Sequence, residues 1–366
     1  MPLLFVKPFL TASQRSVMNE SDEVNYGSYL QLERILDSQF PESSKAGKPA
    51  HDEMLFIMIH QAYEIWFKQI LHEVNSVNEI LARPALNDNS PQLQTVVHRV
   101  SRVVTILKVL VHQIDIMETM TPMDFLDFRD MLRPASGFQS WQFKMIEAKL
   151  GLQFSNRHGQ EHYLSQLKPQ QVQLIRKAES ERSMILLVND WLERMPFFEE
   201  AENWQNYVPR DKETENRSVF WSDYRSIYLE SLADSEQTNA TYFDQVFGDH
   251  ETSPDRQLSA RACRAALFIM LYRGFPILQL PYQLINNLLE TDEQLSTWRY
   301  RHMSMVHRMI GTRIGTGGSS GKDYLRGALE KHYIFGDFAR LTSFLIERRK
   351  LPELSLEMQR RLGFSG

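Results

Sequence analysis

Cysteine is nearly absent from this sequence, and so is any long hydrophobic run. Cys263 is the single cysteine among 366 residues, which excludes an internal disulfide, a cysteine-based zinc site and an iron–sulfur cluster, since each needs two or more thiolates. The longest uncharged stretch, from Gly274 to Leu289, contains two prolines and four amide side chains, which is not typical of a membrane span. Lys7 and Pro8 interrupt the apolar start, so no signal peptide is expected. We expect a cytoplasmic protein without a membrane partner.

An excess of charge of one sign is also missing. The chain has 41 basic and 46 acidic side chains, a net charge of −5, and no basic tract. Proteins that bind a phosphate backbone concentrate lysine and arginine on one surface, so we exclude nucleic acid as a partner. Hydrophobic residues make up 42% of the sequence, enough for a substantial core in one large helical domain or in two domains.

Glycine is absent from two long stretches, between Gly47 and Gly137 and between Gly159 and Gly248. A sheet connected by tight turns needs glycine far more often. Prolines stand where helices are expected to begin or end, and apolar residues recur between them at spacings of three and four. We predict an all-α fold, a large helical bundle. The prolines in question are Pro84, Pro91, Pro122, Pro134, Pro169, Pro196 and Pro281.

Two predicted helices each present a histidine on an apolar face. Residues 51–73 are apolar on nearly all sides in the first turns, with His60 among them. Residues 291–310 are predicted to start with a capping box of Thr291 and Gln294 and carry His302 on an apolar stripe. Haem iron needs a neutral imidazole as axial ligand and a second polar group on its far face. Two satisfied core histidines are the alternative interpretation.

Arg129 lies at the end of a predicted helix that begins at Thr121, with Asp124 completing a capping box. Phe125 and Phe128 share the face of Arg129, so its guanidinium leaves an apolar surface unless an anion meets it. Either the arginine reaches solvent and pairs with a neighbouring aspartate, or it clamps a substrate carboxylate.

Five of the sixteen glycines lie between Gly311 and Gly321. The spacing fits neither a Walker A loop nor a dinucleotide fingerprint. The segment is therefore either a loop that folds over a small polar ligand or a flexible connection. Two metal motifs, one at residues 158–162 and one at residues 51–53, are better interpreted as polar helix starts.

Five separated motifs in this order resemble those of the tryptophan 2,3-dioxygenase family, and the resemblance runs from about Tyr26 to about Ile346. The motifs are Tyr26-Gly-Ser-Tyr29-Leu30, residues 51–68 around Phe56 and His60, Phe125-Leu-Asp-Phe-Arg129, residues 137–143, and Trp298-Arg-Tyr-Arg-His302 followed by residues 315–321. Lys144, Trp141 and His72 depart from the family pattern, and none of them is a site residue.

The resemblance implies an all-α, cytosolic, homotetrameric enzyme with haem b, ferrous in its active form. Such an enzyme uses O2 to cleave the C2–C3 bond of the indole of L-tryptophan, giving N-formyl-L-kynurenine. By motif, His302 is the proximal iron ligand, His60 the catalytic distal residue that contacts the indole, and Arg129 the carboxylate clamp. Further substrate contacts carried over from the family are Phe56, Phe125 and Thr316, with Tyr26, Tyr29 and Leu30 from a neighbouring subunit.

The family resemblance and the composition of the chain together give the expected domain boundaries. We expect an N-terminal arm and first helix over residues 1–50, a haem-binding helical domain over 51–350 with a small helical excursion around 197–257, and a peripheral tail over 351–366. Two other functions stay open: a haem mono-oxygenase of secondary metabolism that acts on a tryptophan or tyrosine derivative, and a haem-binding sensor without turnover.

Overall fold

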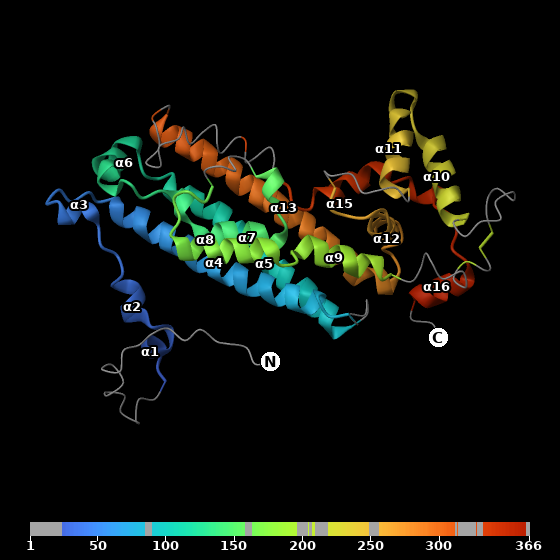
Figure 1. The fold of residues 1–366 in the computed structure, drawn as a ribbon, viewed down its shortest axis with the longest axis horizontal. Coiled ribbons are helices and arrows are strands. Elements are labelled where there is room, and N and C mark those ends of the chain that lie inside the picture. The colour runs from blue at the N-terminus through green and yellow to red at the C-terminus, as the bar shows by residue number, and fades with distance from the viewer. Residues whose placement is uncertain are drawn as a thin grey trace. The chain divides into compact units, whose positions relative to one another are not determined.

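The computed structural model describes residues 24–84, 90–157, 163–195, 204, 207–208, 219–248, 256–311, 313, 327 and 332–363. Within these residues the regular structure is entirely helical (Figure 1), which confirms the predicted all-α class. The chain divides into two compact units between Pro49 and Ala50.

The first unit contains three short helices, α1 (Tyr26–Leu30), α2 (Leu32–Leu36) and α3 (Glu42–Lys45). Asn25 caps α1, because its side-chain Oδ1 accepts the Ser28 backbone N–H at 2.9 Å. No residue of α1 or α2 is buried, and Tyr26 and Tyr29 are 75% and 76% exposed. This segment therefore carries apolar side chains without a core of its own.

Three long helices form the frame of the second unit: α4 (Glu53–Leu81), α5 (Pro91–Met117) and α13 (Pro276–Ile310). Helix α5 packs along both α4 and α13 (Figure 1). Apolar side chains at helical spacing bury the shared faces. These side chains include Ile70, Val74, Val77, Val96, Val100, Leu107, Leu284 and Leu288.

Shorter helices surround this frame. They are α6 (Pro122–Arg129), α7 (Trp141–Leu150), α8 (Pro169–Ser180), α9 (Met184–Glu193), α10 (Val219–Ser231), α11 (Thr238–Phe247), α12 (Ala260–Leu271), α15 (Gly336–Leu341) and α16 (Leu356–Leu362). All of them except α6 and α8 contribute side chains to the main hydrophobic core. Met358 and Leu362 of α16 are fully buried, and the peripheral tail expected over residues 351–366 stays a prediction. The apolar side chains of α16 recur every four residues and seat the helix in the core.

The start of α13 also differs from the prediction. The helix begins at Pro276, fifteen residues before the predicted capping box, and continues through Pro281. The Thr291 hydroxyl donates to the carbonyl of Asn287 at 2.8 Å, as in a helix interior. Pro281 lies in the second turn, where its missing N–H removes one backbone bond, and burial of Leu284 and Leu288 offsets that loss.

A buried ion cluster connects α7 to α13. Glu147 accepts from Arg157 at 2.7 Å and from Arg299 at 2.8 Å, and His332 Nδ1 lies 3.4 Å from the same carboxylate. Desolvation works against the charge, but these neighbours together hold the pKa of Glu147 well below its usual range. The Arg299 guanidinium also donates to the carbonyl of His332 at 3.1 Å. Residue 299 is three positions before His302, so the cluster fixes this part of α13.

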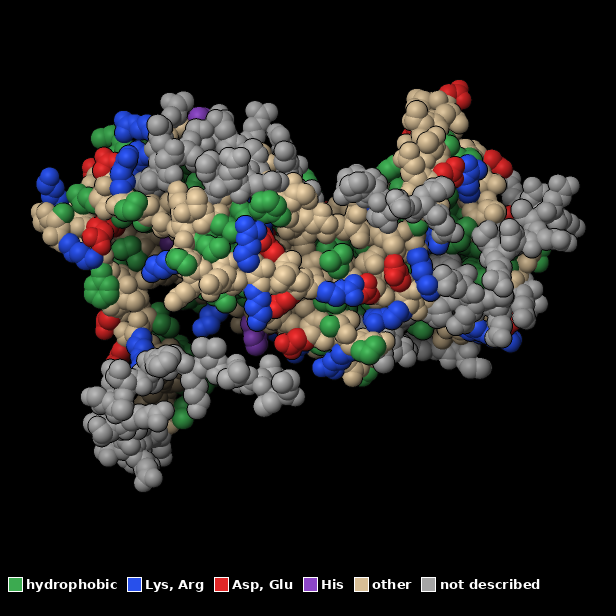
Figure 2. All heavy atoms as spheres, viewed as in Figure 1, with side chains coloured by type: hydrophobic (Ala, Val, Ile, Leu, Met, Phe, Trp, Pro, Cys, Tyr) green, Lys and Arg blue, Asp and Glu red, His purple; other side chains and the backbone are tan. Residues whose placement is uncertain are grey.

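Charged side chains of both signs are interspersed over the described part of the face shown in Figure 2. Among the described residues, Lys149 forms an ion pair with Glu181 at 3.1 Å and Arg182 with Asp190 at 2.5 Å. Such mixing agrees with the balanced composition.

The single cysteine, Cys263, is buried in α12 and has no disulfide partner. Its apolar surroundings raise the pKa of the thiol to about 12, so the thiolate is essentially absent at neutral pH.

Among the described residues, no single helix combines the length and apolar character needed to cross a bilayer. Helices α12 and α13 meet such a test only when taken together, and the chain bends by 113° between them.

Candidate active site

One end of the frame holds a second apolar cluster, separate from the main core, to which α4, α5, α6 and α13 all contribute. The cluster brings together residues far apart in the sequence because α6 packs against α13 beside the first turns of α4. Its members include Phe56, Ile59, Met117, Met120, Phe125, Phe128, Met305 and Met309.

Three phenylalanines form an aromatic wall in this cluster. The Phe56 ring lies 5.6 Å from Phe125 in a stacked arrangement and 5.6 Å from Phe128 edge-on, and Phe125 and Phe128 meet edge-on at 5.4 Å. These separations are favourable for aromatic pairs. Phe56 and Phe125, predicted as substrate contacts, are thus brought together, and the fully buried Phe128 holds them in place.

His60 lies next to this wall on α4. Its Nδ1 is 2.7 Å from the carbonyl oxygen of Phe56, and its ring is 4.2 Å from the Phe56 ring. The residue keeps an exposed edge, although the surrounding protein desolvates it and lowers its pKa. A neutral ring whose Nδ1–H donates to Phe56 presents Nε2 as a hydrogen-bond acceptor.

His302 is half-buried on α13, and its ring stacks on the indole of Trp298 one turn earlier. The two rings are 5.1 Å apart and inclined by 3°. Within the described residues the buried Nδ1 of His302 has no hydrogen-bond partner. Desolvation, together with the charge of nearby His60, lowers the pKa of His302 to about 4. The imidazole is therefore neutral at pH 7.

These properties fit a haem iron. An axial imidazole must be neutral, fixed in orientation and free of competing bonds at its donor nitrogen. His302 meets the first two conditions through desolvation and through the Trp298 stack. Its buried Nδ1 has no described hydrogen-bond partner.

Arg129 is buried, with 5% of its surface exposed, so it does not extend into solvent. The helix that carries it begins as predicted. The Thr121 hydroxyl accepts the Asp124 N–H at 3.3 Å, and the Asp124 carboxylate accepts the Thr121 N–H at 2.9 Å. This capping box fixes the start of α6 and with it the positions of Phe125 and Arg129. A buried guanidinium is suited to binding a carboxylate.

The other predicted site residues are not placed in this cluster. Thr316 lies outside the described residues. Tyr26, Tyr29 and Leu30 belong to the first unit and are exposed there.

The alternative metal sites have no support in the described part of the chain. There, no three His, Cys, Asp or Glu side chains gather closely enough to hold an ion. Residues 51–53 therefore do not form a triad, and residues 158–162 lie outside the described ranges.

A family model described as tryptophan 2,3-dioxygenase matches residues 11–345. The chain belongs to the tryptophan 2,3-dioxygenase family. The tryptophan 2,3-dioxygenase of Bdellovibrio bacteriovorus is 42% identical over 357 residues, covering 93% of this chain and 98% of that protein. That of Alteromonas mediterranea is 44% identical, covering 93% and 97%. The mouse protein (Mus musculus) of the same name is 40% identical, covering 90% and 84%.

Membership in the tryptophan 2,3-dioxygenase family confirms the resemblance inferred from the sequence motifs. Two contributors to the site were not predicted as site residues, Phe128 and Trp298. Their spacing was the available signal, because Phe128 follows Phe125 by three positions and Trp298 precedes His302 by four, which places each pair on one helix face.

Proposed function

We propose that this chain is a haem-dependent dioxygenase that uses O2 to cleave the indole C2–C3 bond of L-tryptophan, giving N-formyl-L-kynurenine, the first step of tryptophan catabolism by the kynurenine pathway. Family membership supports the reaction. The observation that carries the assignment to residues is the neutral His302 ring, which stacks on Trp298 and whose buried Nδ1 has no described hydrogen-bond partner.

His302 would hold haem b as its axial ligand, non-covalently, since the chain has no pair of cysteines for attachment. The bound haem, in its ferrous form, supplies the iron that binds and activates O2. Trp298 fixes the plane of the His302 ring by stacking on it. The Glu147–Arg299 ion pair fixes α13 about one turn before His302.

The substrate would bind through both of its ends. Phe56 and Phe125 form apolar walls for the indole, and Nε2 of His60 accepts the indole N–H. The Arg129 guanidinium binds the carboxylate. Thr316 is proposed as a further contact to the ammonium and carboxylate end.

His60 acts in this scheme as the residue that positions the ring. An indole is electron-rich and needs no strong base before it reacts with activated oxygen, so orientation and exclusion of water supply most of the protein's contribution. A histidine whose pKa is lowered by desolvation remains an acceptor at neutral pH, which suits hydrogen bonding to an N–H.

The N-terminal arm would complete the site of another subunit. We propose a homotetramer in which residues 1–50 exchange between subunits, so that Tyr26, Tyr29 and Leu30 contact a partner's substrate. The absence of buried residues in α1 and α2 supports this proposal. Residues 51–350 would form the haem-binding part, with a helical excursion around 197–257. A reducing compartment such as the cytoplasm suits the single free thiol of Cys263.

The test uses the reduced, haem-loaded protein. Absorbance spectra are recorded with and without L-tryptophan, and the mass of the product formed under labelled O2 is measured. We expect a Soret band, a product with the N-formylkynurenine absorbance and two labelled oxygen atoms per product. Incorporation of one labelled atom would identify a mono-oxygenase instead. Bound haem without product would identify a sensor.

A further inference from the structure

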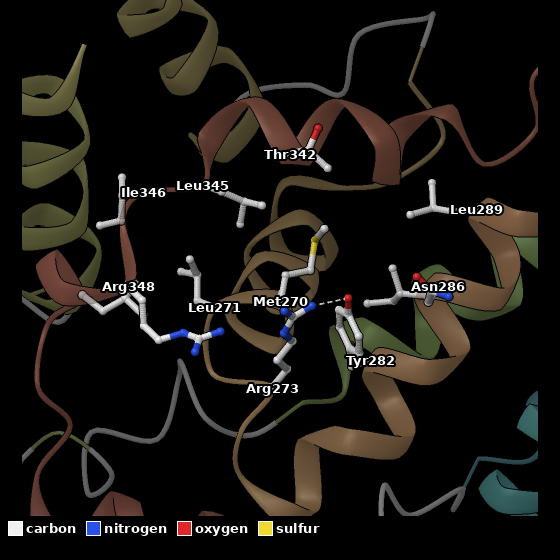
Figure 3. Close-up of a pocket in the computed structure, with 12 residues that line it drawn as sticks. Met270, Leu271, Arg273, Tyr282, Asn286, Leu289, Thr342, Leu345, Ile346 and Arg348 are labelled. Atoms are coloured by element: carbon white, nitrogen blue, oxygen red, sulfur yellow. Dashed lines mark hydrogen bonds between the residues drawn. The ribbon is translucent and has the colours of Figure 1, made fainter.

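A cavity of about 480 Å³ lies between the end of α12, the first half of α13 and the segment from Thr342 to Leu351 (Figure 3). It shares no residue with the apolar cluster around His302. Its volume is in the range that holds small organic ligands.

Two arginines line this cavity. The Arg273 guanidinium donates a hydrogen bond to the hydroxyl of Tyr282 and lies 4.8 Å from the centre of its ring. Arg348 extends toward Arg273 from the opposite side, as Figure 3 shows. Neither arginine forms an ion pair with a described carboxylate, whereas Arg349 and Lys350 both pair with Glu347.

Neither guanidinium can lose its proton, so both line the cavity as permanent cations. An anion bound beside them gains charge-assisted hydrogen bonds. Because both groups are partly in water, the gain is moderate. The positive charges of the two arginines therefore favour an anionic ligand, but they do not by themselves give tight binding.

The remaining walls are mainly aliphatic. Met270 and Leu271 come from α12, Ile285 and Leu289 from α13, and Ile346 from the C-terminal segment. Such walls favour a ligand with a hydrocarbon tail, because burial of the tail contributes binding free energy in proportion to the apolar area removed from water. An inorganic anion has no apolar part, so it would leave these aliphatic walls in contact with water.

We propose that this cavity binds a small amphipathic carboxylate. The carboxylate lies between Arg273 and Arg348, and its aliphatic tail contacts Met270, Ile285 and Leu289. This site is separate from the candidate active site, and the proposal does not depend on which reaction is catalysed there.

The test uses octanoate as the probe and the haem-loaded, full-length protein, with calorimetry in the presence of saturating L-tryptophan. We expect one octanoate per chain and binding at least tenfold weaker for octanamide, which has the same tail without the charge. Equal binding of octanamide would overturn the proposal. So would displacement of octanoate by L-tryptophan, since both would then occupy one site.

Variants of Arg348 test whether octanoate binds in this cavity. Arg348→Gln should weaken octanoate binding about tenfold, and Arg348→Lys, which keeps the charge, should recover most of it. Arg348 is exposed and has no structural partner among the described residues, so these variants should fold normally. Arg349→Gln is the matched control and should bind as the unmodified chain does. An unchanged affinity of Arg348→Gln would show that octanoate binds elsewhere.

Discussion

Two imidazoles of the candidate site have their protonation states set by neighbours. His60 donates to the carbonyl of Phe56, and His302 stacks on Trp298, and desolvation lowers both pKa values. Both rings are therefore neutral at pH 7, the state that the proposed function requires of an indole N–H acceptor at His60 and of an iron ligand at His302.

Replacing His302 tests the ligand assignment directly. His302→Ala should leave the purified chain without a normal Soret band after reconstitution with haem, because the axial bond is lost. His307→Ala is the control, since His307 lies exposed on the same helix, and it should retain the band. A normal spectrum in His302→Ala would refute the assignment.

Replacing Arg129 tests the carboxylate clamp. Removing one partner of a buried, charge-assisted contact costs about 2 kcal/mol or more, which corresponds to roughly a 30-fold rise in the Kd for L-tryptophan. Tryptamine, which lacks the carboxylate, should bind the Arg129→Ala variant and the unmodified chain equally. The control is Arg133→Ala, because Arg133 pairs with Asp130 at 3.3 Å on the surface. Equal losses for both ligands would contradict a clamp.

At the scale of elements, the capping box of α6 couples stability to substrate binding. Thr121→Ala should lower the free energy of unfolding by about 1 kcal/mol, the usual loss for an N-cap threonine. It should also raise the KM for L-tryptophan, because α6 carries Phe125 and Arg129. Thr105→Ala, at an exposed position inside α5, should leave the KM unchanged and should not lower the free energy of unfolding, because alanine has the higher helix propensity. Urea unfolding and steady-state kinetics provide the measurements.

Helix α13 carries a buried carboxylate whose titration can be measured. Asp292 accepts the backbone N–H groups of Ile334 and Phe335 at 3.0 and 2.5 Å. Desolvation nevertheless raises its pKa from 3.8 to about 6. The folded state therefore binds this proton more tightly than the unfolded chain, so the contribution of Asp292 to stability falls as pH rises from about 4 to 6 and is level above that.

Asp292→Asn should remove this pH dependence. The difference in free energy of unfolding between the variant and the unmodified chain should change by on the order of 3 kcal/mol between pH 4 and pH 7, in favour of the variant at the higher pH. Urea unfolding at several pH values gives the difference. A constant difference across this range would mean that the carboxylate has an ordinary pKa in the folded state.

At the scale of the whole molecule, exchange of the arms predicts complementation between subunits. A chain with Tyr26→Ala and Tyr29→Ala and a chain with Arg129→Ala should each have low activity alone. Co-expressed, they should recover activity, since an intact arm can meet an intact site. Co-expression of Arg129→Ala with Phe125→Ala should not recover it, because neither chain has an intact site. Failure of the first pair to recover would exclude exchange.

Local patterns predicted much of the fold and part of the site. The α6 capping box and the apolar faces that carry His60 and His302 depend on neighbours within a few residues, so the sequence specifies them. The start of α13 could not be predicted in this way, because Pro281 is accommodated by burial against other helices. The Glu147–Arg299 pair joins residues 152 positions apart, and no local spacing encodes such a partner.

The burial of Cys263 affects which side chains are open to oxidation. An enzyme that handles activated oxygen exposes its own side chains to peroxide, and a thiolate is the first group to be oxidised. Here the one thiol is enclosed in α12 and stays protonated. Oxidative damage should therefore fall on methionine sulfurs of the candidate active site, Met305 and Met309. Reductases that repair methionine sulfoxide can reverse such damage.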